Sequence, residues 1–471
     1  MKKHLFALSA LSLASVAALA QSSVQIYGVA DAGVSVTTGM LGGTKKHVIS
    51  GIMDGSRLGF KGTEDMGGGW KALFLLENRI ELDTGSNSNV PSSGMQVPDR
   101  WGKRSVIFGN TPVAFSLAGT PVPAPFHAPL IAGATANLNL ALDSVVKTLG
   151  DRLSAASFGV NIGNARFWDR QAYVGLITPV GAVLAGRQYT PAYELNAVFD
   201  TLGTQSSLAA GQVAAVPAVI DIRMSNALQY RVETGGLKAG FMAAAGEGST
   251  SQGRFYGGQI QYKTGAFAVG LGMNTKKNEL GGKSLETKTF GASMDIGNGK
   301  LSFLYNDVSD PNPSGLSALL GGLDQALTLQ IKPALAAGLN ASAPGAGTLL
   351  VGQINNAALV GMYKAAYVQD STVMSIGYKH VTGPHTIYTA FNRYNDKTRF
   401  DSDTDSYGVV YSYAFSKRTD MNFVLTHFNN KGSVAATQGQ AAPGQAGFLG
   451  GFTKAPGEDS NNFAIGLRHR F

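Results

Sequence analysis

Apolar and polar residues alternate along most of the chain. Near the start, six apolar residues share one parity: Val24, Ile26, Ala30, Ala32, Val34 and Val36. The polar residues Gln25, Asp31 and Ser35 have the other parity. Residues 462–471 show the same period of two at the far end. Because successive side chains of a strand point to opposite faces, this pattern predicts half-buried β-strands. Strand patterns do not alternate with helix patterns along the chain, so no parallel sheet is expected.

Sixteen segments are predicted to be strands. They lie near residues 24–37, 56–64, 70–82, 167–177, 182–189, 224–233, 237–246, 254–263, 266–275, 286–296, 299–308, 361–381, 385–395, 404–415, 418–429 and 460–471. The connections between them alternate between tight turns and long loops, and the long ones cover roughly 38–55, 83–166, 190–223, 247–253, 276–285, 309–360, 396–403 and 430–459. Short turns at one end, long loops at the other and an even strand number are typical of an outer-membrane β-barrel.

The fold class predicted is therefore all-β: a 16-stranded antiparallel transmembrane β-barrel with short periplasmic turns and long external loops. In hydrocarbon every backbone polar group needs an internal partner, so a spanning sheet must close on itself. A barrel of this size is too wide for side chains to fill, which leaves an aqueous channel. Aromatic residues near strand ends fit an interfacial girdle, although strand propensity explains any one of them equally well: Tyr27, Tyr173, Tyr189, Tyr262, Tyr378, Phe428 and Phe471.

The N-terminal residues have the layout of a secretory signal peptide. Lys2 and Lys3 precede an apolar run over 5–19, and residues 18–20 form a small-x-small cleavage site. We expect residues 1–20 to be removed and 21–471 to form a single barrel domain. The alternative is a membrane anchor, but the run is short for a span of about 20 residues.

Composition narrows the choice further. The chain has 471 residues with 61 Gly, no Cys, 44% hydrophobic and 14% charged residues. This is too apolar for a disordered chain of high net charge. The lack of Cys excludes disulfides, Cys-ligated zinc and cysteine nucleophiles. The formal net charge is +8, or +6 without Lys2 and Lys3. The basic residues are spread over many strands, so nucleic-acid binding is not expected.

Several segments resemble a known family. Residues 21–33 read QSSVQIYGVADAG and residues 55–69 read GSRLGFKGTEDMGGG. The motifs DRQAYVGL at 169–176, GRQ at 186–188 and GLRHRF at 466–471 continue the match. Together they resemble the general porins of β-proteobacterial outer membranes over well over half of the chain. The resemblance implies a homotrimeric outer-membrane channel for passive diffusion of small hydrophilic solutes, with no cofactor and with the third external loop, 190–223, folded into the lumen.

The C-terminus adds to the resemblance. Phe471 follows His469 and Leu467 at alternate positions. This ending resembles the signal read by the outer-membrane assembly machinery. The implied partners are therefore that machinery, lipopolysaccharide and outer-membrane lipid, the other two subunits, and small hydrophilic solutes or anions.

The candidate site is a charged pore constriction. By parity, Arg57 and Lys61 lie opposite Leu58 and Phe60 and should face the lumen. The resemblance places Arg57, Arg170 and Arg223 in the basic constriction cluster of anion-preferring members, with Arg187 as a fourth candidate. The parity of Arg170 is ambiguous from the sequence.

The third loop carries the predicted negative side of that constriction, with Glu194, Asp200 and Asp221. Facing charges of opposite sign would produce a transverse field. Low-dielectric walls focus the potential of such charges, so a few of them decide which ions pass. The basic candidates and the positive net charge favour anions.

Two long loops depart from the family pattern. Residues 83–166 are much longer than expected for a second loop, and residues 309–360 are rich in Ala, Leu and Gly. Helical spacing occurs over 138–149 and 316–339. The inserted segments would then be short surface helices that cap the mouth, latch neighbouring subunits or merely decorate the surface.

Other chemistries find little support. Asp401, Asp403 and Asp405 start like a calcium loop, but Ser406 and Ser412 stand where an EF-hand needs Gly and Glu, so only a loose calcium or lipopolysaccharide bridge stays open. No HExxH or GxxxxGK[ST] motif occurs, and no metal site is predicted. The alternatives are a substrate-specific channel for small organic anions, an outer-membrane enzyme, for which no nucleophile and base pattern is visible, and a secreted adhesin.

Overall fold

A computed structural model describes residues 23–40, 42–87, 100, 103–157, 166–203, 221–246, 253–401, 403–431, 454 and 457–471; side chains are described outside 23 and 151–157. The predicted signal peptide, 1–20, lies outside these residues. Over the described ranges none of the helices is both long and apolar enough to span a membrane.

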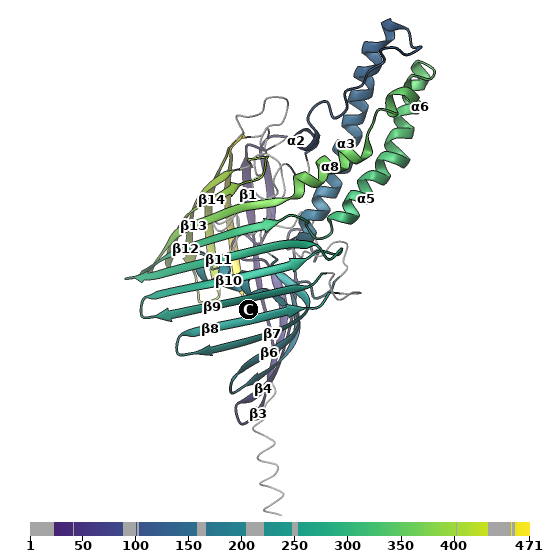
Figure 1. Ribbon diagram of the computed structural model, residues 1–471. Coiled ribbons are helices and arrows are strands. Elements are labelled where there is room, and N and C mark those ends of the chain that lie inside the picture. Colours follow the sequence, from purple (N-terminus) through teal and green to yellow (C-terminus); the bar gives the residue numbers. More distant parts are fainter. Residues whose placement is uncertain are drawn as a thin grey trace, which may run out of the picture.

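The strands form one antiparallel barrel (Figure 1). Among the described residues there are seventeen: β1 (Ser23–Thr38), β2 (Lys45–Ser50), β3 (Arg57–Gly67), β4 (Trp70–Arg79), β5 (Gln171–Thr178), β6 (Gly181–Tyr189), β7 (Arg223–Thr234), β8 (Leu237–Ala244), β9 (Phe255–Thr264), β10 (Phe267–Lys277), β11 (Lys283–Ile296), β12 (Gly299–Asp310), β13 (Gln369–Thr382), β14 (His385–Asp396), β15 (Thr404–Ala414), β16 (Thr419–Asn430) and β17 (Ser460–Arg470). Each strand from β3 onward pairs with the next, and β1 pairs with β17, so the sheet closes.

Seventeen strand segments make sixteen positions around the barrel. The lower half of β1 pairs with β3 and its upper half pairs with β2. Strands β2 and β3 are therefore two parts of one barrel strand, interrupted at residues 51–56. The 16-stranded prediction is confirmed. The expectation of an external loop over all of 38–55 is wrong, because 45–50 continue the pairing with β1.

All sixteen predicted segments contain a strand, but part of one predicted strand is a helix. The twelfth was expected over 361–381, but β13 begins at Gln369 and residues 356–367 form helix α8 (Asn356–Tyr367). The Asn355 side chain accepts a hydrogen bond from the Ala358 backbone N–H at 3.1 Å and caps this helix. An N-cap followed by an Ala-rich segment favours a helix over a strand.

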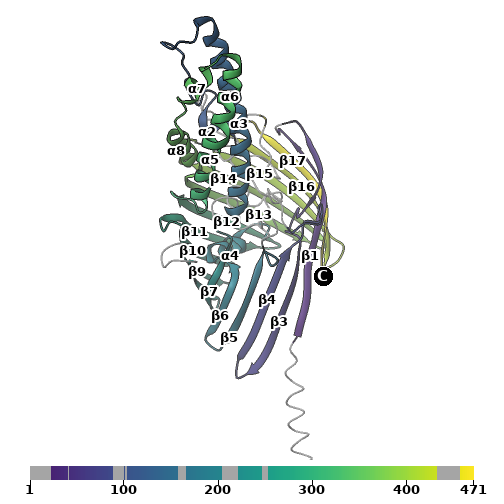
Figure 2. The same ribbon diagram turned by 90° about the vertical axis from the view of Figure 1, so that its right-hand side faces the viewer.

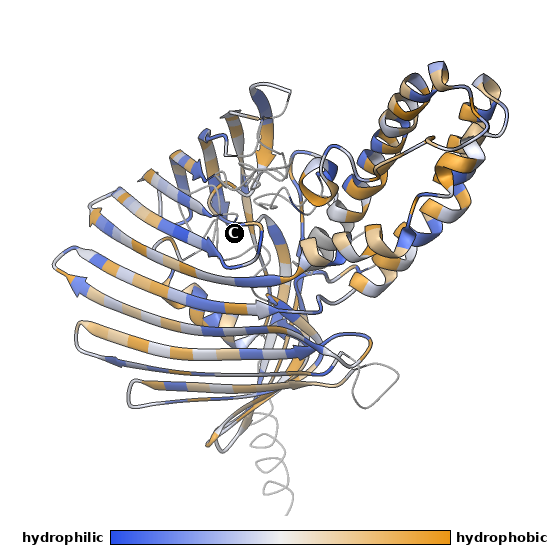
Figure 3. Ribbon diagram, turned by 45° about the horizontal axis from the view of Figure 1, so that its top comes forward, coloured by the Kyte–Doolittle hydropathy of each residue, from blue (hydrophilic) through white to orange (hydrophobic). Residues whose placement is uncertain are grey.

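The two faces of the strands differ as predicted. On β1, Val24, Ile26 and Val34 are exposed on the outside, whereas Asp31 and Ser35 are buried inside. Figure 3 shows the resulting alternation of hydrophobic and hydrophilic residues along the strands. An outside surface that is apolar suits lipid, and a polar inside suits water.

The girdle prediction is wrong for four of its seven aromatic residues. The residues Tyr27, Tyr173, Tyr189 and Phe428 have the parity of the inner face, because strand pairing aligns them with inward residues. Only Tyr262, Tyr378 and Phe471 have outward parity, with Tyr262 and Phe471 47% and 46% exposed. The prediction did not take strand parity into account: Tyr27 lies an even number of positions from the inward Asp31 on the same strand, so it also points inward.

Nine helical segments occur in the described loops: α2 (Arg104–Phe108), η2 (Ala124–Phe126), α3 (His127–Ser157), α4 (Pro191–Phe199), α5 (Leu316–Ala326), η3 (Leu327–Ile331), α6 (Lys332–Ser342), α7 (Ala346–Val351) and α8. The predicted helical spacing over 138–149 and 316–339 is confirmed. Not all of the helices are short, since α3 has 31 residues and a π-helical turn, η3, joins α5 directly to α6.

The helices of the second and sixth loops form one bundle that rises from the long-loop end of the barrel (Figure 2). They share an apolar core that includes Leu138, Leu142, Leu323 and Tyr363. The second loop lies between β4 and β5 and the sixth between β12 and β13, with eight barrel positions between them in either direction. Two loops from opposite sides of the rim thus bury their apolar faces against each other, which is what stabilises amphipathic helices.

Arg100 fixes the second loop to the far wall of the barrel. Its side chain is fully buried and donates to the carbonyls of Ala366 (2.5 Å) and Val368 (2.8 Å). Its Nε lies 3.5 Å from the Asp396 carboxylate. A buried guanidinium needs such partners, so this contact ties the bundle to β13 and β14.

Helix α4 of the third loop lies inside the barrel. Leu195 and Phe199 are buried against the inner wall, where Gly270 and Gly291 leave space that a Cβ would fill. The Asn196 amide donates to the Asn306 side chain at 3.2 Å. The prediction that this loop folds into the lumen is confirmed for α4, and residues 204–220 of the loop lie outside the described residues.

Candidate functional site: an arginine cluster on the inner wall

The interrupted barrel strand bends toward the lumen at residues 51–56. Gly51, at φ +78°, donates its N–H to the Asp31 carbonyl at 2.7 Å. The Asp31 carboxylate accepts the backbone N–H groups of Ile52, Met53 and Asp54 at 3.1, 2.9 and 2.8 Å. Three N–H groups on one carboxylate hold the turn in place. The start of β3 is thereby set beside the third loop.

Arg57 and Arg170 converge on one carboxylate, that of Glu77. Arg170 Nε donates to Glu77 Oε1 at 2.6 Å, and Arg57 Nε lies 3.7 Å from Oε2. The Tyr27 hydroxyl donates to the same Oε2 at 3.0 Å. Arg57 Nη2 also donates to Asp54 Oδ2 at 2.8 Å. Charge-assisted bonds of this kind fix both guanidinium groups on the wall.

Tyr189 links Arg170 to Arg223. Its hydroxyl accepts from Arg170 Nη2 at 2.7 Å and from Arg223 Nη2 at 3.4 Å. The Arg223 guanidinium lies 4.8 Å from the Tyr189 ring centre, and Tyr193 of α4 stacks on that ring at 4.9 Å. Within the described residues, Arg223 Nε and Nη1 are buried without a hydrogen-bond partner. Arg223 therefore keeps two buried donors with no partner among the described residues.

Arg187 and Arg79 meet Asp169 next to this group. Arg187 Nε donates to the Asp169 carbonyl at 2.7 Å, and its Nη1 donates to Ser225 Oγ at 3.0 Å. Arg79 lies 3.3 Å from both the Asp169 and the Glu81 carboxylates. Arg187 sits where a bulge shifts the register of β6 against β7, which explains why strand parity does not assign it. We call Arg57, Arg79, Arg170, Arg187 and Arg223 the arginine cluster.

Lys61 lies on the same inner face, as parity predicts. It is exposed, and its Nζ is 5.1 Å from the centre of the Tyr27 ring. Arg57 and Lys61 pair with Val29 and Gln25 of β1, which share the inward parity of Asp31. The structure therefore brings the four predicted arginines together, and Lys61 lies on the same inner face against Tyr27.

The predicted acidic residues of the third loop have other partners. Glu194 on α4 accepts from Arg231, which comes from β7 and is outside the cluster. The Gln229 and Gln259 amides donate to its other oxygen at 3.3 and 2.9 Å. Burial raises the pKa of the Glu194 carboxyl, and Arg231 and the two amides oppose this shift. Glu194 thus helps to fasten α4 to the wall.

Asp200 and Asp221 mark the two stems of the third loop. The Asp200 N–H donates to the Asn196 carbonyl at 2.9 Å and ends α4. Asp221 pairs with Lys276 at 3.0 Å, and the Thr190 hydroxyl donates to its carbonyl at 2.5 Å. The carboxylates in contact with the cluster are instead wall residues, namely Asp54, Glu77, Glu81 and Asp169.

Glu77 and Arg79 were missed from the sequence, and Tyr189 was predicted for the interfacial girdle instead of the site. Glu77 is aligned with Gly59 and Gln171 on neighbouring strands. The sequence around Glu77 only weakly indicates that it faces the lumen, because residues 73–76 are all apolar and show no alternation. Strand parity alone does not locate its partners, since they depend on the pairing of three strands.

Phe471 lies at the seam where the barrel closes. Its N–H and carbonyl exchange hydrogen bonds with Gly28 at 3.2 and 3.1 Å, and a side chain at Gly28 would collide with its ring. Leu467 and His469, at the alternate positions before Phe471, lie on the same outer face. The His469 and Phe471 rings stack with centres 6.4 Å apart.

The calcium-loop residues are engaged in other contacts. Asp405 pairs with Arg393 at 2.8 Å, and the Asp403 carboxylate accepts the Asp396 backbone N–H at 2.9 Å. Over the ranges described, no three His, Cys, Asp or Glu side chains gather into a group that would hold a metal ion.

Comparisons with known proteins agree with this architecture. A family model described as Gram-negative porin matches residues 7–433. The chain is 27% identical over 481 residues to outer membrane porin protein 32 of Delftia acidovorans, covering all of both chains. It is 29% identical over 249 residues to an outer membrane porin protein of Bordetella pertussis, covering 46% of this chain and 64% of that protein.

A solved structure shares the fold. The anion-selective porin from Comamonas acidovorans matches with a TM-score of 0.57 and 21% identity, over 96% of this chain and 100% of that one. With the family model matching most of its length, and with a closed 16-stranded barrel and an inserted third loop, this chain belongs to the Gram-negative porin family of outer-membrane channels.

Proposed function

We propose that this porin is an anion-preferring channel for the passive diffusion of small hydrophilic solutes. The observation that carries the proposal is the arginine cluster. With Lys61 it supplies six formal positive charges, against four from Asp54, Glu77, Glu81 and Asp169. The surplus of two lies in a confined lumen, where it attracts anions. The related protein from Comamonas acidovorans is an anion-selective porin.

The electric field we propose differs from the one expected from the sequence. Glu194 and Asp221 are paired with Arg231 and Lys276, so they add little negative charge opposite the cluster. The negative charges lie among the arginines on the same wall. The preference for anions therefore arises from a local cation surplus and weakens with salt, because the Debye length is about 8 Å at physiological ionic strength.

The test is the reversal potential of single channels in a planar bilayer under a salt gradient. Wild-type protein should favour anions, and Arg57→Ala and Arg223→Ala should each reduce that preference. Arg104→Ala is the matched control, since Arg104 lies in the helical bundle and pairs with Asp143. A preference for cations in the wild-type channel would contradict the proposal.

A second candidate is a substrate-specific channel for small organic anions. The stacked Tyr189 and Tyr193 rings beside the unsatisfied donors of Arg223 favour it, because a planar carboxylate would meet both an aromatic surface and a guanidinium. Block of chloride current that saturates with one organic anion, and is lost in Arg223→Ala, would distinguish it from simple diffusion.

We further propose that the chain works as a homotrimer with a cleaved signal peptide, that Leu467, His469 and Phe471 form its assembly signal, and that lipopolysaccharide contacts its outer surface. The exposed, outward position of Phe471 supports recognition by assembly factors. Since its relatives are channels, we propose transport and not catalysis as its activity.

A further inference from the structure

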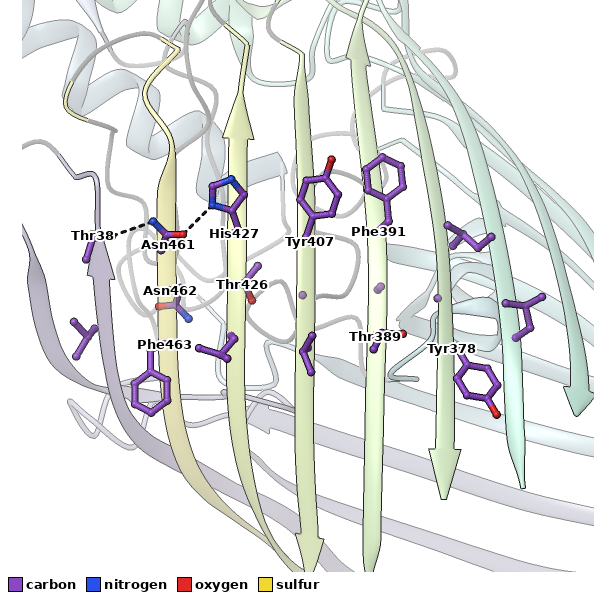
Figure 4. A pocket seen from close by; sticks show the side chains of 18 residues that line it. Thr38, Tyr378, Thr389, Phe391, Tyr407, Thr426, His427, Asn461, Asn462 and Phe463 are labelled. Atoms are coloured by element: carbon purple, nitrogen blue, oxygen red, sulfur yellow. Dashed lines mark hydrogen bonds between the residues drawn. The ribbon is translucent and has the colours of Figure 1, made fainter. Parts of the chain in front are cut away.

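A second group of basic side chains lies in the lumen near the short turns. Lys263, Lys300 and Lys379 come from β9, β12 and β13, each close to the short-turn end of its strand. Lys300 shares a strand face with Asn306, which bonds to α4 inside the barrel. Figure 4 shows Tyr378 among the side chains that line a groove on the outer face, so the next residue of β13, Lys379, points inward. We call these three residues the lysine group.

Two members of the lysine group are direct neighbours. Lys300 and Lys379 are aligned on adjacent strands, which lie about 4.8 Å apart, so their like charges repel each other. Asp295, aligned with Lys300 on β11, is also 3.6 Å from Lys263 Nζ. Lys379 Nζ instead lies 5.4 Å from the centre of the Tyr388 ring. One carboxylate thus lies between two lysines, and the third lysine rests against an aromatic side chain.

The lysine group lies on the short-turn side of the third-loop helix. Lys300 Nζ donates to the Val198 carbonyl at 3.4 Å, in the last turn of α4, where the helix dipole favours a cation. The charge of Asp200, which follows α4, also acts on Lys300. Strands β12 and β13 are eight barrel positions from β4 and β5, respectively. The lysine group therefore faces the wall of the arginine cluster from the opposite side of the lumen.

Two arginines continue this positive surface beyond Tyr388. Arg468 and Arg470 share the Asp420 carboxylate at 3.1 and 2.9 Å, and the charges of all three act on Tyr388. With the lysine group they make five positive charges, against one carboxylate here and two beside the lysines. The surplus of two positive charges would attract an anion that has already passed the arginine cluster.

We propose that Lys300 and Lys379 form a second anion site, which takes a doubly charged oxyanion such as inorganic phosphate. Because their strands are adjacent, both ammonium groups reach one tetrahedral anion, whose charge relieves their repulsion. The proposal rests on the proposed anion preference and adds a site on the opposite wall, nearer the short turns. Weak sites in series let an ion enter a channel and leave it again.

The test is block of the chloride current of single channels by inorganic phosphate at pH 8. Wild-type current should fall and then level off as phosphate is added. Lys379→Gln removes one ammonium group that has no contact with α4. It should weaken the block by at least about fivefold, since a unit charge 4 Å away contributes about 1 kcal/mol in water. Lys379→Arg keeps the charge and should keep the block.

Lys71→Gln is the matched control. Lys71 also points inward near a short turn, because it shares a face of β4 with Glu77, but it pairs with Asp65 at 3.1 Å. Its substitution should leave the phosphate block as in the wild type. Arg223→Ala should lower the anion preference while the block still depends on Lys379.

An unchanged block in Lys379→Gln would overturn the proposal. Loss of the block in both Lys379→Gln and Lys379→Arg would also overturn it, because charge would then not be the cause. Loss of the block in Arg223→Ala alone would assign phosphate to the arginine cluster instead. A wild-type channel that prefers cations would overturn the proposed function as well, so the two failures are distinguished by the wild type itself.

Discussion

Arg170 and Glu77 lie 2.6 Å apart across 93 residues of chain, and both are buried on the inner wall. The second loop, with its long helix, separates them in sequence, whereas the pairing of β4 with β5 unites them in space. Breaking such a buried pair from the carboxylate side leaves an arginine charge uncompensated. Glu77 is thus the residue that limits how positive the cluster is.

Glu77→Gln should make the channel more selective for anions. The amide keeps the size of the side chain and can still accept from Arg170, but it removes one negative charge. A unit charge at about 6 Å in water contributes about 0.7 kcal/mol, which is roughly a threefold change in the anion-to-cation permeability ratio. Reversal potentials at low salt measure this ratio.

The control is Glu233→Gln, since Glu233 pairs with Lys238 beside a short turn and both side chains are more than half exposed. It should leave the ratio unchanged. A Glu77→Gln channel that is less anion-selective than the wild type would show that Glu77 matters by holding Arg57 and Arg170 in position, not by its charge.

Arg100→Met should loosen the helical bundle from the barrel. The substitution leaves Asp396 buried without its guanidinium and removes the donors to two carbonyls. Loss of one member of a buried pair costs about 3–5 kcal/mol. Because the contact joins the bundle to β13 and β14, we expect faster amide hydrogen exchange in α8. The barrel itself should stay folded, as shown by the usual shift in gel migration when the sample is heated.

Arg104→Met is the comparison for that experiment. Arg104 pairs with Asp143, whose side chain is 49% exposed, and an exposed pair is worth less than about 1 kcal/mol. Equal exchange rates in the two variants would mean that the apolar core of the bundle, and not Arg100, holds it on the rim.

The sequence predicts the barrel because strand period and loop length are local. Each stretch such as 24–37 carries its own alternation, and most of the short turns carry their own Gly, Asn or Pro. The positions of Arg57 and Lys61 follow from that parity. What the sequence does not reveal depends on pairings between distant segments. The carboxylate that faces Arg57 and Arg170 is set by the register of β3, β4 and β5, and the bulge at Arg187 breaks parity locally.

The loops show the same limit. Leu138 and Leu142 reveal a helix by their spacing, but their partners are set by a loop that leaves the opposite side of the barrel. Glu194 has the composition of a pore carboxylate, yet the packing of α4 turns it toward Arg231. The strand assignment of 361–367 fails because apolar residues in a short run fit a helix and a strand alike.

Glu279→Gln should weaken the attachment of α5 at neutral pH. The Glu279 carboxylate accepts the Gly315 N–H at 2.8 Å, the Ser317 N–H at 3.3 Å and the Ser317 hydroxyl. Partial burial alone would raise the pKa of Glu279, but these hydrogen bonds outweigh it and hold that pKa below its usual value. Loss of a cap of this kind costs about 1 kcal/mol.

The pH dependence of that effect follows from the direction of the pKa shift. A carboxyl whose pKa is lowered in the folded state stabilises it above the ordinary Glu pKa of about 4.3, and this stabilisation disappears as the pH falls through the lowered pKa. Hydrogen exchange of the α5 amides should therefore differ between wild type and Glu279→Gln at pH 7 and converge as the pH falls through the lowered pKa of Glu279. A difference between the two that is already absent at pH 7 would argue against a charged cap.

Glu194 should make the anion preference depend on pH in the mildly acidic range. Its pKa is raised by burial against α4 and the wall, so it takes up a proton at a higher pH than an exposed Glu does. Protonation removes the charge that offsets Arg231 in the lumen. As the pH falls through the raised pKa, the reversal potential should therefore move further toward anions, by an amount similar to that of removing one lumenal carboxylate. Glu194→Gln should show the acidic value at every pH from 4 to 8. A wild-type profile that is flat above the ordinary pKa of Glu would show that Arg231 keeps Glu194 ionised throughout this range.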